Sequence, residues 1–369
     1  MNAQNHAFHG SDLEKIEEEY GIPKERIVSF SANVNPLGCP ESAKEALKDN
    51  LDAISRYPDR DYTQLKTAIA SYTDADPVHI VLGSGVTELL SLFLGLILPK
   101  SALIIGPAYS EYEKDLKRLG CEVSYCMAEE AKDFVLTKEE ILTATEERTD
   151  LVILCNPNNP TSGALKKSDI AYLAEEYDKM GILLLIDETY AEFSTEREDI
   201  TAASLIERFS NLVVLRGTSK FFATPGLRLG YALTGSKELL AKAEKTQDPW
   251  NINAAAEICG SVMFRDEAYI RQVQETMEKE KQYVCESLTQ IPGIRIFPVY
   301  ANFVLVKLPE GSITSDALFE ELVKKGMMIR DCSTFPTLDN RFIRICFMSH
   351  EDNMRLITAI KEALLGKAE

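Results

Sequence analysis

The sequence predicts an α/β fold in two parts: a large domain around a mostly parallel sheet, followed by a smaller α+β domain. The length of 369 residues corresponds to about two domains of ordinary size. Short apolar runs are continuous rather than alternating, as in strands buried on both faces of a parallel sheet. Amphipathic segments such as residues 167–179 separate these runs, as crossover helices would. The apolar runs are residues 79–82, 102–105, 151–154, 182–186 and 212–215.

The pattern changes after about residue 245. A long charged helix is expected over residues 267–288, and strands and helices with antiparallel character follow it. These elements are strands at 294–297, 302–306 and 342–347, a helix at 315–325 and a last helix from Glu351. We therefore expect an N-terminal arm, a large domain and a small C-terminal domain. Their expected ranges are residues 1–29, 30–245 and 246–369.

The composition excludes some classes of function. Lysine and arginine number 40 against 58 aspartate and glutamate residues, which gives a net charge of −18. Such an acidic surface repels phosphate backbones and anionic lipids, and no run of basic residues offsets it. The longest strongly apolar stretch, residues 89–98, has about half of the ~20 residues that a membrane span needs. We therefore expect neither nucleic acid nor a membrane as a partner.

The termini and the cysteines point to the cytoplasm. The first 15 residues have neither the basic segment nor the apolar segment of a secretory signal. Eight cysteines are scattered along the chain without a C-x-x-C pair. This usage favours reduced thiols over a disulfide framework or a zinc site, so no metal is expected.

Polar residues follow three of the predicted strands, where ligands of open α/β sheets bind. Residues 83–88 (GSGVTE) would let backbone N–H groups at a helix N-terminus approach an anion, or would form an ordinary glycine turn. The loop at residues 155–161 (CNPNNPT) offers two amide side chains, or forms an asparagine-rich turn. Asp187 directly follows five apolar residues, where a carboxylate needs a cationic partner unless it caps a helix.

Lys220 follows the strand at residues 212–215, after hydroxyl residues and before two phenylalanines. A partly desolvated lysine loses proton affinity and becomes a nucleophilic amine suited to a Schiff base. Taken alone, this residue is better interpreted as a surface lysine.

The four motifs together resemble one family. The chain contains residues 157–161 (PNNPT), 187–190 (DETY), 219–220 (SK) and 226–228 (GLR) in this order. This set is similar to the fold-type I pyridoxal 5′-phosphate (PLP) enzymes of the class I/II aminotransferase group, over essentially the whole chain. The resemblance implies the aspartate-aminotransferase-like fold.

Further motifs resemble the histidinol-phosphate aminotransferase branch of this group, and within it most closely the threonine-phosphate decarboxylases of cobalamin biosynthesis. This narrower resemblance depends on four segments and not on the core motifs. They are residues 9–10 (HG), 30–38 (FSANVNPLG), 248–253 (DPWNIN) and 329–333 (IRDCS).

The resemblance implies a role for each core residue. Lys220 would bond covalently to PLP and later move protons, while Asp187 would pair with the pyridine nitrogen and keep it protonated. Tyr190 and Asn159 would hydrogen-bond the phenolic oxygen of the cofactor. Tyr109 would stack on its ring.

The cofactor phosphate would lie at the helix N-terminus after residue 85, beside a hydroxyl and a guanidinium. The residues implied are Gly85, Val86, Thr87, Ser219 and Arg228. By the same resemblance Tyr57 would reach the phosphate of a neighbouring subunit, which implies a homodimer with shared active sites.

The resemblance also implies a substrate site on the small domain. Arg344 and Arg330 match two anion-binding arginines of the family, which suits an amino acid with two acidic groups, such as a phosphorylated one. Asn33 and His9 lie where the N-terminal arm of the family closes the pocket. Without the resemblance, His9 reads as a residue of a disordered tail.

Two positions depart from the family pattern. Gly217 stands where serine or threonine is usual, so one phosphate contact is missing or Thr218 shifts to replace it. Ser162 lies between Thr161 and Gly163, where the pattern runs directly from threonine to glycine, so the turn there could differ.

The motifs predict the cofactor better than the bond that is broken. PLP weakens the α-carbon bond that stands perpendicular to its ring, so a decarboxylase presents the carboxylate there and an aminotransferase the proton. We expect decarboxylation of O-phospho-L-threonine to (R)-1-amino-2-propanol phosphate. The alternative is transamination of histidinol phosphate or a related amino acid with 2-oxoglutarate. A PLP sensor fused to a DNA-binding segment would need a basic extension, which the sequence does not show.

Overall fold

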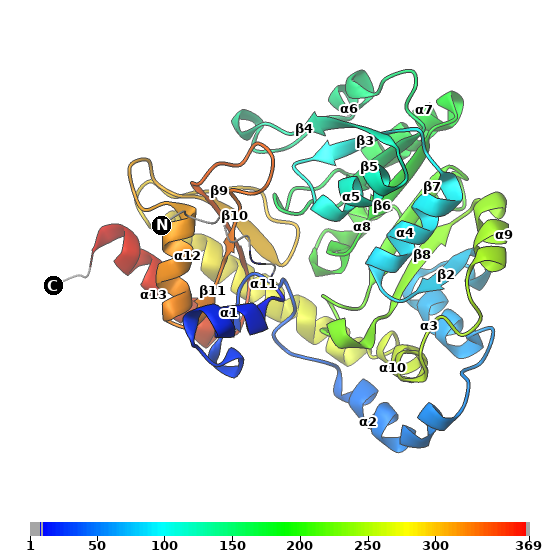
Figure 1. The fold of residues 1–369 in the computed structure, drawn as a ribbon, viewed down its shortest axis with the longest axis horizontal. Coiled ribbons are helices and arrows are strands. Elements are labelled where there is room, and N and C mark those ends of the chain that lie inside the picture. Colours follow the sequence, from blue (N-terminus) through cyan, green and yellow to red (C-terminus); the bar gives the residue numbers. More distant parts are fainter. Residues whose placement is uncertain (1–7, 9, 367–369) are drawn as a thin grey trace.

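The large domain is built on a seven-stranded sheet with helices on both faces (Figure 1). The computed structural model describes residue 8 and residues 10–366. The strand order is β2-β8-β7-β6-β5-β3-β4, and β8 is antiparallel to both of its neighbours, while the pairs from β7 to β4 are parallel. The strands are β2 (Ile80–Gly83), β3 (Ser101–Gly106), β4 (Glu122–Met127), β5 (Leu151–Cys155), β6 (Leu183–Asp187), β7 (Leu212–Gly217) and β8 (Gly230–Thr234).

The continuous apolar runs predicted from the sequence form the buried strands of this sheet. Alternate residues of β6 face opposite sides: Leu184 and Ile186 pack with one cluster of buried side chains, and Leu185 packs with another. Helix α7 covers the first face, and α4, α5 and α9 cover the second. These helices are α4 (Val86–Ile97), α5 (Ser110–Arg118), α7 (Lys167–Met180) and α9 (Lys237–Thr246).

The sequence did not predict strands β4 and β8. Strand β4 lies at the edge of the sheet and is only partly buried, so it has no continuous apolar run. Strand β8 is fully buried, but it is short and begins at a glycine.

The small domain contains a four-stranded antiparallel sheet in the order β12-β13-β10-β9, packed with α11, α12 and α13 (Figure 1). This architecture confirms the predicted fold class. Its strands are β9 (Arg295–Ile296), β10 (Phe303–Lys307), β12 (Arg330–Asp331) and β13 (Phe342–Cys346). Its helices are α11 (Glu267–Thr289), α12 (Ser315–Lys324) and α13 (His350–Leu365).

The N-terminal segment lies against the small domain. Strand β1 (Val28–Ser29) pairs in parallel with β11 (Met327–Met328), and α1 (Leu13–Tyr20) lies on the same side of the molecule (Figure 1). Helix α10 (Ala254–Met263) packs against α2 (Glu41–Asp49) and α3 (Thr63–Thr73), although it follows residue 245. The three predicted domain ranges remain predictions.

Two short helices complete the large domain, α6 (Lys138–Ala144) and α8 (Arg197–Ile200). Among the described residues, no helix combines the length and the apolar character that crossing a bilayer requires.

Candidate active site

The carboxyl ends of three neighbouring parallel strands bring the predicted motifs to one edge of the large sheet. In the sheet register Cys155 of β5 lies beside Asp187 of β6, and Asp187 lies beside Leu215 of β7. The three segments that follow these strands therefore begin at the same level. They contain Asn159, Tyr190 and Lys220 respectively.

Lys220 is a largely desolvated amine at this edge. Its Nζ donates a hydrogen bond of 2.6 Å to the carbonyl oxygen of Ala32. Burial, followed by the positive charges of Arg344 and Arg228, lowers the pKa of Lys220 to about 8. Near pH 8 about half of these amines are therefore unprotonated and nucleophilic, as the sequence predicted for a Schiff-base lysine.

Asp187 is a buried carboxylate whose hydrogen-bond partners are neutral. Oδ2 accepts from the Tyr112 hydroxyl at 2.7 Å, and Oδ1 accepts from the backbone N–H of Thr189 at 2.9 Å and from its hydroxyl. Burial raises the pKa of Asp187 above its ordinary value. Among the described residues no cation forms an ion pair with it, so the carboxylate suits a cationic group placed in the site.

Tyr190 stands between the two domains. Its buried ring contacts the edge of Phe303 on β10 at a centroid distance of 5.0 Å, and its hydroxyl accepts from Asn33 Nδ2 at 3.3 Å. Burial raises the pKa of the Tyr190 phenol. The Asn33 side-chain oxygen is buried and has no hydrogen-bond partner in the structure, so it remains a free acceptor.

Arg344 of β13 closes the site from the small domain. It donates to the side-chain oxygen of Asn159 and, at 2.8 Å, to the carbonyl oxygen of Ser31. Its Nε is buried without an acceptor. These partners are neutral, so the guanidinium keeps a positive charge that a bound anion can neutralise.

Arg330 lies directly across from Arg344, because β12 and β13 are antiparallel neighbours in that register. Burial and the nearby charge of Arg344 lower the pKa of Arg330. Arg330 donates to the carbonyl oxygen of Phe8 and, at 3.0 Å, to the Thr334 hydroxyl. Two like charges at one cross-strand position destabilise a sheet unless an anion lies between them. His9, which was predicted to join them, lies outside the described residues.

The start of α4 and Arg228 lie together where the sequence predicts a cradle for the cofactor phosphate. Residues Val86 and Thr87 open the helix, where backbone N–H groups have no partner within the helix. Arg228 Nη2 donates to the carbonyl oxygen of Ser84 at 3.0 Å. A β-carbon on Gly85, whose φ is 91°, would lie 2.5 Å from that same nitrogen, so only glycine keeps the cradle open. Ser219 lies half-buried beside Lys220.

The structure accounts for both departures from the family pattern. A β-carbon on Gly217 would approach the Val86 side chain to 2.8 Å, which favours glycine there. The Thr218 hydroxyl does not replace the missing one, because it donates to Leu229 O and accepts from Thr224. Ser162 has a φ of 63° and is fully buried, and its N–H donates to the carbonyl oxygen of Asn158, which forms a tight turn.

The two remaining predicted aromatic residues differ in exposure. Tyr109 precedes α5, and its ring contacts the edge of the Tyr112 ring at 5.8 Å; burial raises the pKa of Tyr109 to about 12. Tyr57 is 79% exposed, and its ring packs on Trp250 at 4.5 Å. A side chain this exposed does not cover the site of its own chain. Its position is compatible with the predicted contact to another subunit.

Sequence reasoning missed Tyr112. It lies three residues after Tyr109, a spacing that puts both rings on the same side of α5. That spacing was the available signal, but a tyrosine at an apolar helix position reads as core. It also missed Ser31 and Ala32, whose backbone carbonyl oxygens accept hydrogen bonds from Arg344 and Lys220.

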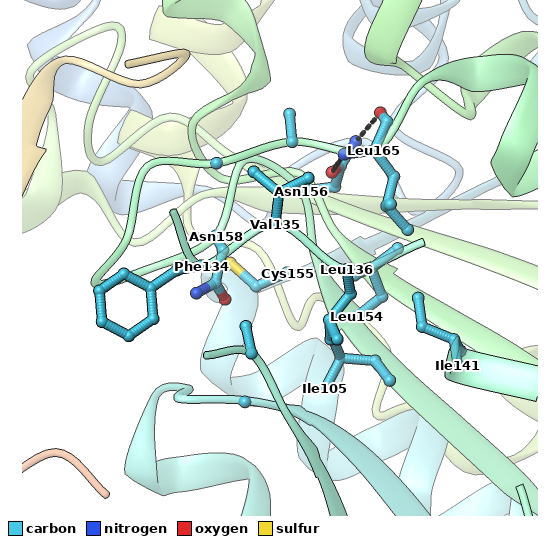
Figure 2. Close-up of a pocket in the computed structure, with 14 residues that line it drawn as sticks. Ile105, Phe134, Val135, Leu136, Ile141, Leu154, Cys155, Asn156, Asn158 and Leu165 are labelled. Carbon is cyan, nitrogen blue, oxygen red and sulfur yellow. Dashed lines mark hydrogen bonds between the residues drawn. The ribbon is translucent and has the colours of Figure 1, made fainter. Parts of the chain in front are cut away.

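A small cavity of about 40 Å³ lies behind the loop after β5 (Figure 2). Its lining is mainly apolar and includes Asn156 and Asn158, and the Asn156 side chain donates to the carbonyl oxygen of Leu165 (Figure 2). Ligand pockets typically measure about 300–1,000 Å³, so this cavity is too small to hold a cofactor.

The chain is similar to known proteins along most of its length. A protein of Caldanaerobacter subterraneus subsp. tengcongensis, which carries the provisional name threonine-phosphate decarboxylase, is 40% identical over 330 residues, covering 89% of this chain and 88% of its own. The threonine-phosphate decarboxylase of Salmonella typhimurium is 33% identical over 360 residues, covering 98% and 97%.

A solved structure of the histidinol-phosphate aminotransferase from Clostridium acetobutylicum superposes with a TM-score of 0.84 at 33% identity, covering 90% of this chain and 97% of its own. The family model for aminotransferase class I and II matches residues 25–360. With that match and these relatives along nearly the whole chain, the protein belongs to the class I and II aminotransferase family.

Proposed function

We propose that this protein is a PLP-dependent decarboxylase that converts O-phospho-L-threonine to (R)-1-amino-2-propanol phosphate and CO2, a step of cobalamin biosynthesis. The observation that carries the proposal is the cross-strand pair of Arg330 and Arg344, which offers two neighbouring guanidiniums to a substrate with two anionic groups. The similarity to two proteins named as threonine-phosphate decarboxylases supports the same substrate class.

The large-domain side of the site fits PLP. Asp187 offers a buried negative charge for the pyridinium nitrogen, and Lys220 offers an amine whose pKa is lowered to about 8. The start of α4 and Arg228 offer donors to the phosphate. Bound there, PLP supplies an electron sink for the bond broken at the substrate α-carbon.

Tyr109, Tyr190 and Asn159 would orient the cofactor from three sides. Tyr109 would cover one face of its ring, and Tyr190 and Asn159 would hydrogen-bond its phenolic oxygen. Asn159 also accepts from Arg344, which links the cofactor side of the site to the substrate side.

The substrate side would hold the two anionic groups between Arg344 and Arg330, with the free acceptor of Asn33 nearby and His9 completing the pocket. Once the carboxylate leaves as CO2, the ammonium form of Lys220 would donate a proton to the α-carbon in its place. A carboxylate held by a desolvated guanidinium keeps one orientation, which determines the bond that breaks.

We also propose that the active protein is a cytoplasmic homodimer with shared sites. Three large apolar side chains of one short segment are strongly exposed, namely Leu51 (58%), Ile54 (79%) and Tyr57 (79%). Large apolar side chains exposed within one short segment are typical of a protein interface, and Tyr57 would reach the cofactor phosphate of the neighbouring subunit. The eight free cysteines are consistent with a reducing compartment.

The deciding experiment supplies purified, PLP-loaded protein with O-phospho-L-threonine in the absence of any 2-oxo acid and follows CO2 release. Sustained turnover is expected, because a decarboxylase consumes no amino acceptor. No CO2, together with loss of the visible PLP absorption on addition of histidinol phosphate or glutamate, would identify an aminotransferase. That second candidate is favoured by the similarity to the Clostridium acetobutylicum structure.

A further inference from the structure

Ser162, which departs from the family pattern in the loop at positions 155–163, makes contacts that the pattern does not account for. It is fully buried and adopts the left-handed conformation with a φ of 63°. Its own N–H donates to the carbonyl oxygen of Asn158 at 2.7 Å, which closes the turn. A left-handed conformation strains a residue that has a β-carbon, so glycine would be the expected occupant.

The hydroxyl of Ser162 binds the small domain. Ser162 Oγ accepts from the backbone N–H groups of Tyr300 at 3.1 Å and Ala301 at 2.9 Å. The N–H of Tyr300 also donates to the Ser162 carbonyl oxygen at 3.0 Å, so it keeps a partner without the hydroxyl. The Ala301 N–H belongs to a buried residue, and removal of the hydroxyl would take away its acceptor.

The segment held by Ser162 leads directly to the substrate arginine. Asn302 donates to the carbonyl oxygen of Asn33 at 3.0 Å, and β10 begins at the next residue. Strand β10 pairs with β13, where Leu305 lies opposite Arg344. Phe303 of β10 also lies under the Arg344 guanidinium, 5.1 Å from ring centroid to charge centre.

The same loop meets Arg344 from its other side through the side-chain oxygen of Asn159, three residues before Ser162. The loop therefore contacts the small domain at two places: the Asn159 contact with Arg344, and the Ser162 contact with the strand that supports Arg344. Two attachments from one rigid loop restrain the guanidinium more closely than one attachment.

We propose that Ser162 is a positioning residue for substrate binding. Its hydroxyl holds residues 300–302 of the small domain against the loop after β5, and this sets Arg344 at one place relative to Asn159. The inference rests on the proposed function, in which Arg344 holds an anionic group of the substrate.

The test compares Ser162→Gly and Ser162→Ala as PLP-loaded enzymes. Both variants lose the hydroxyl, but glycine relieves the left-handed backbone and alanine keeps the β-carbon. Ser236→Gly is the matched control, because its hydroxyl also accepts a backbone N–H, from Leu239 at 3.3 Å, at the start of α9. We measure KM and kcat for O-phospho-L-threonine, PLP affinity, the visible absorption and the melting temperature.

We expect KM to rise about tenfold in both Ser162 variants, from a lost buried hydrogen bond. Turnover, PLP affinity and the visible absorption should stay within about threefold of wild type, since Lys220, Asp187 and Arg228 are untouched, and Ser236→Gly should match wild type. An unchanged KM in both Ser162 variants would overturn the proposal. A rise in KM confined to Ser162→Ala would assign the effect to the strained backbone. A loss of PLP affinity that parallels the rise in KM would show that the residue is merely structural. Either result also rejects the proposal.

If neither variant yields folded holoenzyme, Ser162→Cys replaces them, since a thiol is a weak acceptor at the same place, and KM should rise by about threefold. The wild-type enzyme separates this question from the proposed function. If it transaminates instead of releasing CO2, the proposed function fails, and the same variants are compared for L-glutamate, whose carboxylate Arg344 would hold. A KM for glutamate equal to that of wild type would then overturn the role of Ser162.

Discussion

The two halves of the active site are held in different ways. The half that contains Lys220 and Asp187 is built on strand ends of one seven-stranded sheet, where neighbouring parallel strands hold the residues in register. The half that contains Arg330 and Arg344 belongs to the small domain and contacts backbone carbonyl oxygens of the N-terminal segment. The sheet half positions a cofactor within one rigid element, whereas the other half depends on contacts between parts of the chain far apart in sequence.

The largest effect should follow from loss of the amine on the sheet half. We expect Lys220→Ala to eliminate turnover and the visible absorption of bound PLP, because it removes the buried amine that would bond to the cofactor. Borohydride reduction followed by peptide mapping identifies the peptide that carries covalently bound PLP. In the wild type this should be the Lys220 peptide, and in the variant no peptide should carry PLP. Retention of the label at another lysine in the variant would contradict the assignment.

The next largest effect should weaken substrate binding by the small-domain half and leave cofactor binding by the sheet half nearly unchanged. Arg344→Ala removes the buried guanidinium, and a charged hydrogen-bonded contact of about 2–3 kcal/mol predicts a rise in the substrate KM of about 30- to 150-fold. PLP affinity should change by less than about threefold. Arg341→Ala is the control, since that residue precedes the same strand but pairs with Asp339 at the surface. Equal losses of substrate and PLP affinity would show that Arg344 is structural.

A smaller effect should appear in the pH dependence of cofactor loading. Because burial lowers the pKa of Lys220 to about 8, the reactive unprotonated amine increases as the pH rises and levels off above that value. The rate at which the apoprotein binds PLP should therefore rise about tenfold per pH unit below pH 7 and become flat near pH 9. A rate that keeps rising to pH 10 would indicate an ordinary exposed lysine.

The smallest expected effect comes from the support of the cofactor carboxylate. Tyr112→Phe deletes one hydrogen bond to Asp187 and leaves the ring packing, so a loss of about 1 kcal/mol predicts roughly fivefold weaker PLP binding. Substrate KM should stay within about twofold of wild type. Tyr177→Phe, which loses a hydroxyl contact to Thr145 directly after α6, is the control. Equal PLP affinities in the two variants would show that the Tyr112 hydroxyl does not support cofactor binding.

The sequence allowed more of the sheet half to be predicted than of the other half. Asp187 and Lys220 each follow a continuous apolar run, and parallel strands place such positions at a common edge. Tyr112 escaped notice because its role depends on the partner that its hydroxyl meets, which no pattern within α5 records. Tyr57 matched the family motif, but the structure of one chain leaves it on the surface.

The sequence by itself determined the fold class, five of the seven strands of the large sheet, and the set of chemical groups at the strand ends. Those features are local, since they follow from apolar periodicity and from residues adjacent in the chain. Only the tertiary structure decided that Arg330 lies across from Arg344, that Ser162 holds residues 300–301, and that Gly217 leaves room for Val86. Each of these contacts joins segments many residues apart, and its geometry depends on how whole elements pack rather than on any one stretch of sequence.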